Sequence, residues 1–213
     1  MTRINLNYDY EKHKTAMRYW LQGKGWHLAL KALEMGLEHH VGRRKDGTPE
    51  FSHQIFQAQY VRTLPSLMYP EETMAVVFLH DIVEDCGVRF ATIHQEFGEL
   101  VGSGVDYMSD VDAQGKEKPV TAFFAAMVAS PVASLGKGVD RSHNFQSMLP
   151  VFPLEKQIRY IGETRDHILP MLKAARKKYT QQEPAYQNVK HLLLTQIELI
   201  EALHVSVRNE RTG

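Results

Sequence analysis

An apolar run that ends in a group of ionisable side chains constrains the fold of this 213-residue chain more than any other feature. Residues 74–79 are all hydrophobic, and the segment His80-Asp81-Ile82-Val83-Glu84-Asp85 follows them directly. On a helix, residues three and four positions apart share a face, which puts Glu84 one turn beyond His80 and Asp81. Buried charges are unfavourable unless they are paired or bound to a metal. The segment therefore predicts that other helices bring ligands or counter-charges to this point, and a solvated helix end is the alternative.

Two other stretches of the chain offer partners for His80 and Asp81. His53 follows a polar, glycine-containing loop over residues 42–49, and Asp140 lies much further along the chain. Two imidazoles and two carboxylates suit manganese, iron or zinc, and the share of oxygen ligands favours Mn²⁺. No cysteine belongs to this set, which excludes a thiolate zinc site.

Three short blocks occur in order along the chain. They read Arg-Arg-Lys-Asp-Gly-Thr-Pro at residues 43–49, followed by His53; His-Asp-Ile-Val-Glu-Asp at residues 80–85; and Asp-Arg-Ser-His-Asn at residues 140–144. An isolated His, a His-Asp pair and a distant Asp resemble the HD phosphohydrolase superfamily. The Glu-Asp pair makes the chain most similar to the RelA/SpoT-like alarmone hydrolases, including their small single-domain members, and this likeness spans roughly residues 26–176.

The resemblance implies a role for each residue type in the three blocks. The metal ligands would be His53, His80, Asp81 and Asp140. The catalytic carboxylates would be Glu84 and Asp85, with Glu84 placed to orient or deprotonate a water molecule whose pKa a divalent ion lowers. The substrate contacts would be Arg44, Lys45, Arg141 and Asn144, because arginine binds phosphate through two parallel hydrogen bonds. His143 is expected to support this site rather than to bind the metal.

The expected reaction is removal of the 3′-pyrophosphate from ppGpp or pppGpp, which yields GDP or GTP and pyrophosphate. We expect a hydrolase only, because 213 residues are too few to hold a synthetase domain as well. Gln54, Glu50 and Cys86 depart from the residues usual in the family at these positions. They keep open a related phosphohydrolase that acts on a dNTP, a dNMP or NADPH. A non-catalytic nucleotide sensor is the third possibility.

Bulk composition is typical of a soluble enzyme. The 25 Lys and Arg residues balance the 25 Asp and Glu residues, so no overall field draws the chain to nucleic acid or to a membrane. A single cysteine allows no internal disulfide, which suits a reducing cytoplasm. Neither a signal peptide nor a membrane-spanning apolar run is expected, and the predicted partner is a small-molecule nucleotide.

The periodicity of apolar residues predicts a single all-α domain of about eight to ten helices, and the resemblance implies that this domain is an HD-domain bundle. We expect an N-terminal helical extension over residues 1–25, the hydrolase core over 26–180, and a C-terminal helix with a short tail over 181–213. His39 and His40 end the first core helix, where histidine interacts favourably with the helix dipole, and both are expected to be structural. The expected helices are 10–22, 26–40, 51–68, 71–85, 90–97, 100–108, 121–129, 133–145, 154–178 with a bend at Pro170, and 184–207.

Overall fold

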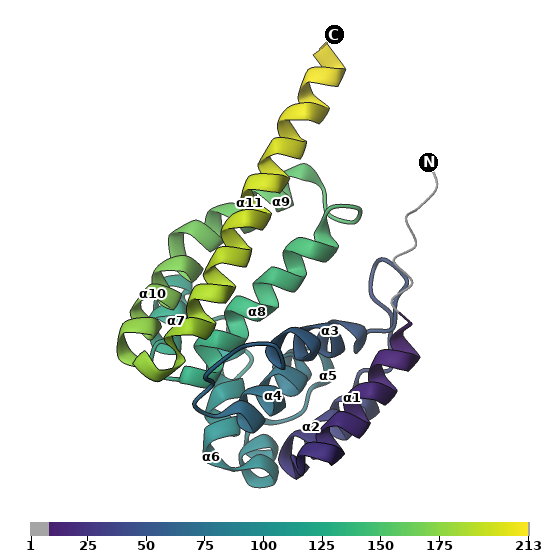
Figure 1. Ribbon diagram of the computed structural model, residues 1–213, viewed down its shortest axis with the longest axis vertical. Helices are drawn as coiled ribbons and strands as arrows, with labels where there is room; N and C mark the ends of the chain where they lie inside the picture. The colour runs from purple at the N-terminus through teal and green to yellow at the C-terminus, as the bar shows by residue number, and fades with distance from the viewer. Residues whose placement is uncertain (1–8, 213) are drawn as a thin grey trace.

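The computed structural model describes residues 9–212, and these residues form a helical bundle without a β-strand (Figure 1). This confirms the predicted all-α class. The α-helices are α1 (Tyr10–Lys24), α2 (His27–His39), α3 (Ser52–Val61), α4 (Pro70–Leu79), α5 (Ile82–Cys86), α6 (Phe90–Met108), α7 (Val120–Met127), α8 (Pro131–Met148), α9 (Leu154–Glu163), α10 (Leu169–Lys178) and α11 (Glu183–Thr212). The division into an extension, a core and a C-terminal helix stays a prediction.

Helix α4 forms the centre of the bundle. Every residue from 73 to 79 is buried, because α2, α3, α6 and α8 pack around it. This explains why the sequence of α4 is apolar on all sides rather than along one stripe. The end of α4 therefore delivers His80 and Asp81 to the interior of the molecule.

Helix α8 crosses α4 and is also buried along most of its length. Two glycines let neighbouring helices approach it closely. A Cβ atom at Gly136 would lie 2.8 Å from the sulfur of Met108, and one at Gly138 would lie 2.7 Å from a methyl group of Val189 on α11. These close contacts hold α8 inside the bundle. Asp140, two residues after Gly138, is therefore buried as well.

Two predicted helices end earlier than expected. The helix predicted over 51–68 stops at Val61, because Pro65 follows and disfavours a helical conformation at Leu64. Ser66 then adopts a φ of 57°, which carries the chain away from the helix direction. The helix predicted over 71–85 stops at Leu79 and resumes as α5 at Ile82, so His80 and Asp81 lie in a break between two helices.

The stretch over residues 154–178 is helical throughout but changes its winding in the middle. A π-helical turn over Thr164–Ile168 joins α9 to α10, immediately before Pro170. Because proline has no N–H to donate and its ring clashes with the carbonyl four residues earlier, a wider turn relieves this conflict. The predicted bend is thus a local π turn that begins six residues before the proline. Gly98, with a φ of 79°, separates the two halves of α6 as expected.

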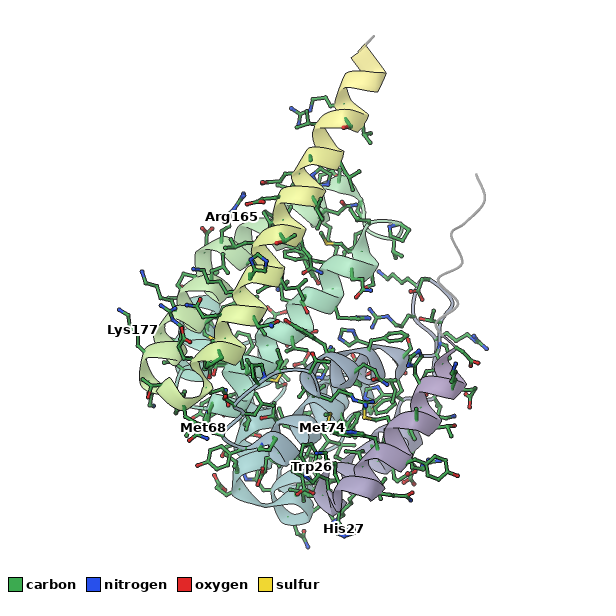
Figure 2. The ribbon with its side chains drawn as sticks, viewed as in Figure 1. Trp26, His27, Met68, Met74, Arg165 and Lys177 are labelled. Atoms are coloured by element: carbon green, nitrogen blue, oxygen red, sulfur yellow. The ribbon has the colours of Figure 1, made fainter. Side chains whose placement is uncertain are left out.

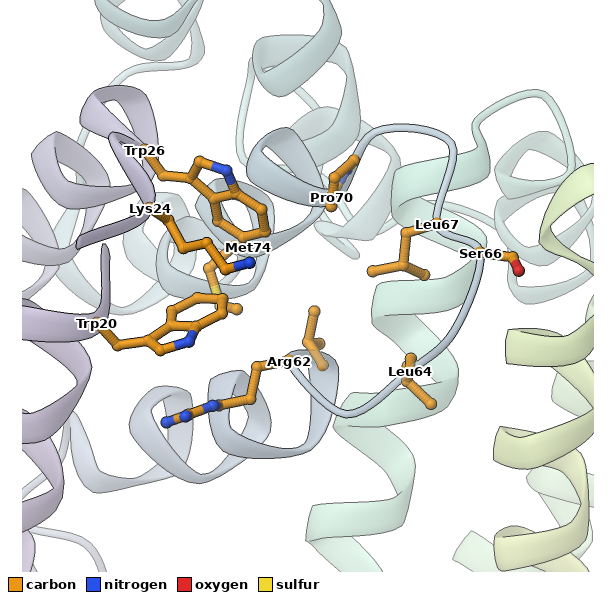
Figure 3. A pocket seen from close by; sticks show the side chains of 10 residues that line it. Trp20, Lys24, Trp26, Arg62, Leu64, Ser66, Leu67, Pro70 and Met74 are labelled. Carbon is orange, nitrogen blue, oxygen red and sulfur yellow. The ribbon is translucent and has the colours of Figure 1, made fainter. Parts of the chain in front are cut away.

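Helix α1 packs on α2 and α3 rather than standing apart from the core. Arg18 on α1 forms a two-pronged ion pair with Glu34 on α2, with nitrogen–oxygen distances of 2.6 and 2.7 Å. Trp20 and Trp26 meet edge to face, with ring centroids 5.0 Å apart. Together with Met74 they line one side of a cavity of about 270 Å³, which Figure 3 shows from close by.

Helix α11 packs its N-terminal half on α8 and then continues beyond the bundle, as the yellow segment of Figure 1 shows. Arg165, labelled in Figure 2, ties the π turn to this helix through an ion pair with Glu201. Leu199 and Leu203 are among the exposed apolar side chains. No helix in residues 9–212 is both long enough and apolar enough to span a bilayer.

Candidate metal centre

Three mutually packed helices position the four predicted metal ligands. His53 lies on α3, His80 and Asp81 lie in the break after α4, and Asp140 lies on α8. Each of these helices packs against the other two. The four residues, 87 positions apart from first to last, therefore meet at one point inside the bundle.

The ligand atoms of the four residues are close enough to share one ion. His53 Nε2 lies 3.0 Å from Asp140 Oδ1 and 3.9 Å from Asp81 Oδ2. His80 Nε2 lies 3.0 Å from Asp81 Oδ2 and 3.7 Å from Asp140 Oδ1. Three of these side chains are almost fully buried, whereas that of Asp81 is 29% exposed. The centre thus has one side open to solvent.

The two ring nitrogens of His80 have different surroundings, and these show where a cation would bind. Its Nδ1 lies 2.9 Å from the carbonyl oxygen of Val77, which can only accept, so Nδ1 carries the proton. Its Nε2 is buried without a hydrogen-bond partner among the described residues and faces two carboxylates. A lone pair that faces carboxylate oxygens is repelled unless a proton or a metal ion lies between them. This donor set fits a divalent ion with nitrogen and oxygen ligands.

The pKa values show the same need for positive charge. Burial opposes a charge on His80, but the carboxylates of Asp81 and Asp140 outweigh it and raise the pKa of His80. Burial would raise the pKa of Asp81, but the charge of His80 holds it below its usual range. Burial lowers the pKa of His53 despite its contact with Asp140. A bound metal ion would replace the proton that His80 otherwise retains.

Several neighbours orient the ligands. His143 Nδ1 lies 2.7 Å from His53 Nδ1, which fixes the His53 ring and leaves its Nε2 toward the centre. The amide of Asn144 donates to Asp140 Oδ1 over 2.9 Å, so Asn144 also holds a ligand in place. Residues 143 and 144 thus support the centre from α8.

Two orienting residues were missed by sequence reasoning. Lys137 lies one helical turn before Asp140, and its Nζ is 3.4 Å from Asp140 Oδ2. Gln57 lies one turn after His53 and places its amide nitrogen 2.5 Å from His53 Nε2, where it competes for the lone pair that a metal would use. The spacing of three and four residues from a ligand was the available signal. Neither residue type stands out in a sequence, because Lys and Gln usually lie at the surface.

The two predicted catalytic carboxylates have different surroundings. Glu84 Oε1 accepts hydrogen bonds from the hydroxyl of Ser109 at 2.7 Å and from the backbone N–H of Asp110 at 2.8 Å. Burial raises the pKa of Glu84 above its usual value in spite of these bonds. Asp85 instead lies near Glu50 and His40, with one nitrogen or oxygen atom of each within 4.8 Å of the others. Burial, followed by the charge of Asp81, raises the pKa of Asp85 to about 6.

The predicted substrate loop is a tight turn closed by backbone hydrogen bonds. The N–H of Arg44 donates to the carbonyl of Thr48 at 2.9 Å, and Gly47 takes a φ of 86°. Arg44 is half-buried, and its charge contributes to lowering the pKa values of His53 and His143, behind the larger effect of burial. The charge of Arg44 is therefore close enough to act on two histidines of the centre. Lys45 is exposed and lies near Lys156, whose pKa is lowered by burial and then by Lys45.

Arg141 is turned away from this loop. It is 4% exposed, forms an ion pair with Glu163 on α9, and donates to the backbone carbonyl of Tyr160 at 3.1 Å. The guanidinium also stacks over the Tyr160 ring, 4.3 Å from its centroid. The structure thus joins α8 to α9 through Arg141 and does not bring it to the four ligands, so a substrate contact by Arg141 stays a prediction.

The chain is similar to several bacterial proteins of much greater length. It is 30% identical over 150 residues to a probable GTP pyrophosphokinase of Mycobacterium leprae, a match that covers 68% of this chain and 19% of that protein. It is 31% identical over 140 residues to a probable guanosine-3′,5′-bis(diphosphate) 3′-pyrophosphohydrolase of Synechocystis, covering 62% of this chain and 18% of that protein. A pyrophosphohydrolase of Vibrio cholerae is 28% identical over 140 residues, covering 62% of this chain and 19% of that protein.

The chain thus spans about a fifth of the length of the curated relatives it matches. No protein-family model matches the chain. The relatives are named both as pyrophosphokinases and as pyrophosphohydrolases, so their names do not separate the two activities. Over about two thirds of its length, the chain is related in sequence to the RelA/SpoT-type proteins.

Proposed function

We propose that this protein is a metal-dependent phosphohydrolase of the HD type that removes the 3′-pyrophosphate from ppGpp or pppGpp. The convergence of His53, His80, Asp81 and Asp140 on one buried point carries this proposal, because two imidazoles and two carboxylates at these distances form a donor set for a divalent ion, which would replace the proton on His80. The similarity to proteins named as 3′-pyrophosphohydrolases supports the choice of substrate.

The four ligands would hold Mn²⁺ or another divalent ion, which when bound supplies Lewis-acid chemistry and lowers the pKa of a water molecule. Glu84 is the proposed general base. Its raised pKa brings it closer to neutrality, where a carboxylate can accept a proton more effectively. Ser109 and the backbone of residue 110 hold one of its oxygens, which fixes the direction of the carboxylate.

Arg44 is the proposed phosphate-binding residue. It lies on a turn closed by backbone hydrogen bonds, its charge acts on His53, and it makes no ion pair among the described residues, so its charge is available to a polyphosphate. Lys45 on the same loop and Lys156 on α9 lie near each other and add positive charge beside it. Phosphoryl transfer depends mainly on positioning and charge neutralisation, which these cations would provide.

A phosphohydrolase that acts on another nucleotide, a dNTP, a dNMP or NADPH, is the second candidate. Glu50 favours it, because this carboxylate stands at the inner end of the proposed substrate loop, with its Oε2 within 3.2 Å of the backbone nitrogen of Gly42. A negative charge at this position would repel a nucleotide whose phosphates lie beside Glu50 and would allow one whose phosphates lie elsewhere.

A nucleotide panel tests the proposal. Purified protein loaded with Mn²⁺ is incubated with ppGpp, pppGpp, dGTP, dGMP and NADPH, and the products are separated by ion-exchange chromatography. We expect GDP or GTP and pyrophosphate from the alarmones, no turnover by a His53→Ala variant, and full turnover by a His39→Ala variant, whose imidazole is exposed. Turnover of dGTP with ppGpp left intact would contradict the substrate assignment, and tight ppGpp binding without product would indicate a sensor.

A further inference from the structure

A second group of metal-ligating side chains lies next to the candidate metal centre. His40 follows the end of α2, Glu50 lies in the turn before α3, and Asp85 lies on α5. One nitrogen or oxygen atom from each of the three lies within 4.8 Å of the corresponding atoms of the other two. None of the three belongs to the four-ligand set described above.

The imidazole of His40 is buried but incompletely hydrogen-bonded. Its side chain has no solvent exposure, and its Nε2 has no hydrogen-bond partner among the described residues. Its Nδ1 lies 3.5 Å from Cys86 Sγ, a weak partner, and 4.0 Å from Glu50 Oε2, which is too long for a hydrogen bond. Nδ1 is therefore the nitrogen on the side of the carboxylate, and a neutral imidazole protonated at Nε2 presents the Nδ1 lone pair there with only a thiol as its partner.

The group carries negative charge without a matching cation. Among the described residues, neither Glu50 nor Asp85 forms an ion pair with a lysine or arginine. After burial, the charges of Asp81 and Glu50 contribute most to raising the pKa of Asp85. His40 could supply a counter-charge, but burial lowers its pKa more than Asp81 and Glu50 raise it. A neutral imidazole beside two carboxylates is a donor set for a cation.

The geometry suits a metal ion better than a proton. With metal–ligand bonds of about 2.0–2.2 Å, two ligands of one ion lie about 3 to 4.4 Å apart, and the 4.0 Å between His40 and Glu50 falls in this range. The backbone holds Glu50 in position, since Gly42 N–H donates to its Oε2 at 3.2 Å. A Cβ atom at position 42 would lie 2.9 Å from the same oxygen, so the glycine is needed for this approach.

We propose that His40, Glu50 and Asp85 bind a second divalent cation, with one nitrogen and two carboxylate ligands and water in the remaining positions. Mixed nitrogen and oxygen ligands of this kind suit Mn²⁺ or Zn²⁺. The proposal goes beyond the proposed function and does not depend on it, because it concerns metal binding and not the substrate. It predicts two cations per chain, where the four-ligand centre alone predicts one.

Metal stoichiometry tests the second site. Metal-free protein is dialysed against a series of Mn²⁺ concentrations, and bound manganese is measured by elemental analysis. We expect two ions per chain for the wild type, one for Glu50→Gln, one for Asp85→Asn and one for His53→Ala. Glu38→Gln, which removes an exposed carboxylate from α2, should keep two. Circular dichroism establishes that each variant retains its helical content.

The outcomes separate this proposal from the proposed function. One ion in the wild type, one in Glu50→Gln and none in His53→Ala would overturn the second site and leave the four-ligand centre intact; His40 would then be an ordinary buried histidine stacked on Phe51. One ion in the wild type, none in Glu50→Gln and one in His53→Ala would support the second site and contradict the centre on which the proposed function depends. Two ions in Glu50→Gln would also overturn the second site.

Discussion

Glu84 and Asp85 are neighbours in the sequence, but the structure separates their surroundings. Glu84 is held by Ser109 and the N–H of residue 110, whereas Asp85 faces Glu50 and His40. Because α5 turns by about 100° per residue, adjacent side chains point in different directions. The two carboxylates are therefore suited to different tasks, and substitutions should distinguish them.

We expect Glu84→Gln to keep metal binding while its turnover falls by about 10²-fold or more, the usual scale for a general acid–base group. Glutamine preserves the hydrogen bonds to Ser109 and residue 110 but cannot accept a proton from water. The measurement is kcat for ppGpp at saturating Mn²⁺, with bound metal determined on the same sample. Glu117→Gln, an exposed position in the loop before α7, is the matched control. Full turnover by Glu84→Gln would remove this residue from the mechanism.

Arg44→Ala should mainly raise KM, because a contact that binds substrate and transition state alike affects binding rather than kcat. Arg43→Ala is the control from the same turn, since the Arg43 guanidinium donates to the carbonyl of Gly47 at 2.8 Å and is exposed. Steady-state kinetics with ppGpp provide the measurement. If Arg43→Ala raised KM and Arg44→Ala did not, the phosphates would lie on the outer side of the loop.

The sequence predicted which residues would meet at the centre, but not all of their contacts. The spacing of His80 and Asp81 and their resemblance to a known pattern were enough to name the four residues that the structure brings together, and their role as metal ligands stays a prediction. The sequence did not predict that Asn144 donates a hydrogen bond to Asp140 or that Arg141 pairs with Glu163, and the substrate contacts predicted for both residues stay predictions. Such pairings depend on how α8 and α9 pack, which no single sequence specifies. The same is true of His40 and Glu50, whose proximity arises from the fold.

At the scale of elements, glycine and proline explain most differences between expectation and structure. The break in α6 was predicted because Gly98 is a strong signal for a helix end. The early end of α3 was missed because its apolar pattern continues beyond Val61, and the conformation of Ser66 cannot be read from composition. The π turn before Pro170 was anticipated only as a bend.

The two halves of α6 are joined across Gly98 by a histidine, and this predicts a pH dependence. His94 lies 3.1 Å from Glu99 and 3.1 Å from Asp106, and although burial opposes its charge, these carboxylates raise its pKa. Because the pKa of His94 is higher in the folded than in the unfolded state, its charged form stabilises the fold. This stabilisation is complete at pH values below the pKa of His94 in the unfolded state, and it is lost as pH rises through the pKa in the folded state.

We therefore expect His94→Gln to lower Tm at about pH 5. At about pH 9 the substitution should have little effect, because the native histidine and the introduced glutamine are then both uncharged. Thermal unfolding followed by circular dichroism at the two pH values measures this difference. His27→Gln, at an exposed position, should have little effect at either pH. An equal loss of Tm for His94→Gln at both values would mean that packing, rather than the imidazolium, supplies the stability.

The close packing of α8 against α11 predicts that a larger side chain at Gly138 destabilises the fold. Gly138→Ala should destabilise the fold by about 1–3 kcal/mol, the usual effect of overpacking, because its Cβ would lie 2.7 Å from Val189 and 3.1 Å from Leu172. Gly162→Ala on α9 meets nothing within 4 Å and should be neutral or stabilise by up to about 1 kcal/mol. Chemical denaturation gives both values. Equal stabilities for the two variants would show that α11 can move away from α8.

At the scale of the whole molecule, the candidate metal centre lies where α3, α4 and α8 meet. These helices come from distant parts of the chain, and α4 is buried because α2, α3, α6 and α8 surround it. An ion bound there would connect the first third of the chain with the middle third, so metal binding and the stability of the bundle should be linked. The helical class was predictable from periodicity, whereas this crossing of α4 and α8 required the three-dimensional structure.

Anomalous scattering at the manganese absorption edge, from crystals of the protein grown with saturating Mn²⁺, locates the bound ion directly. We expect an anomalous peak within bonding distance of His53, His80, Asp81 and Asp140. The absence of a peak among these four side chains under saturating metal would show that they do not bind the ion and would overturn the proposed function.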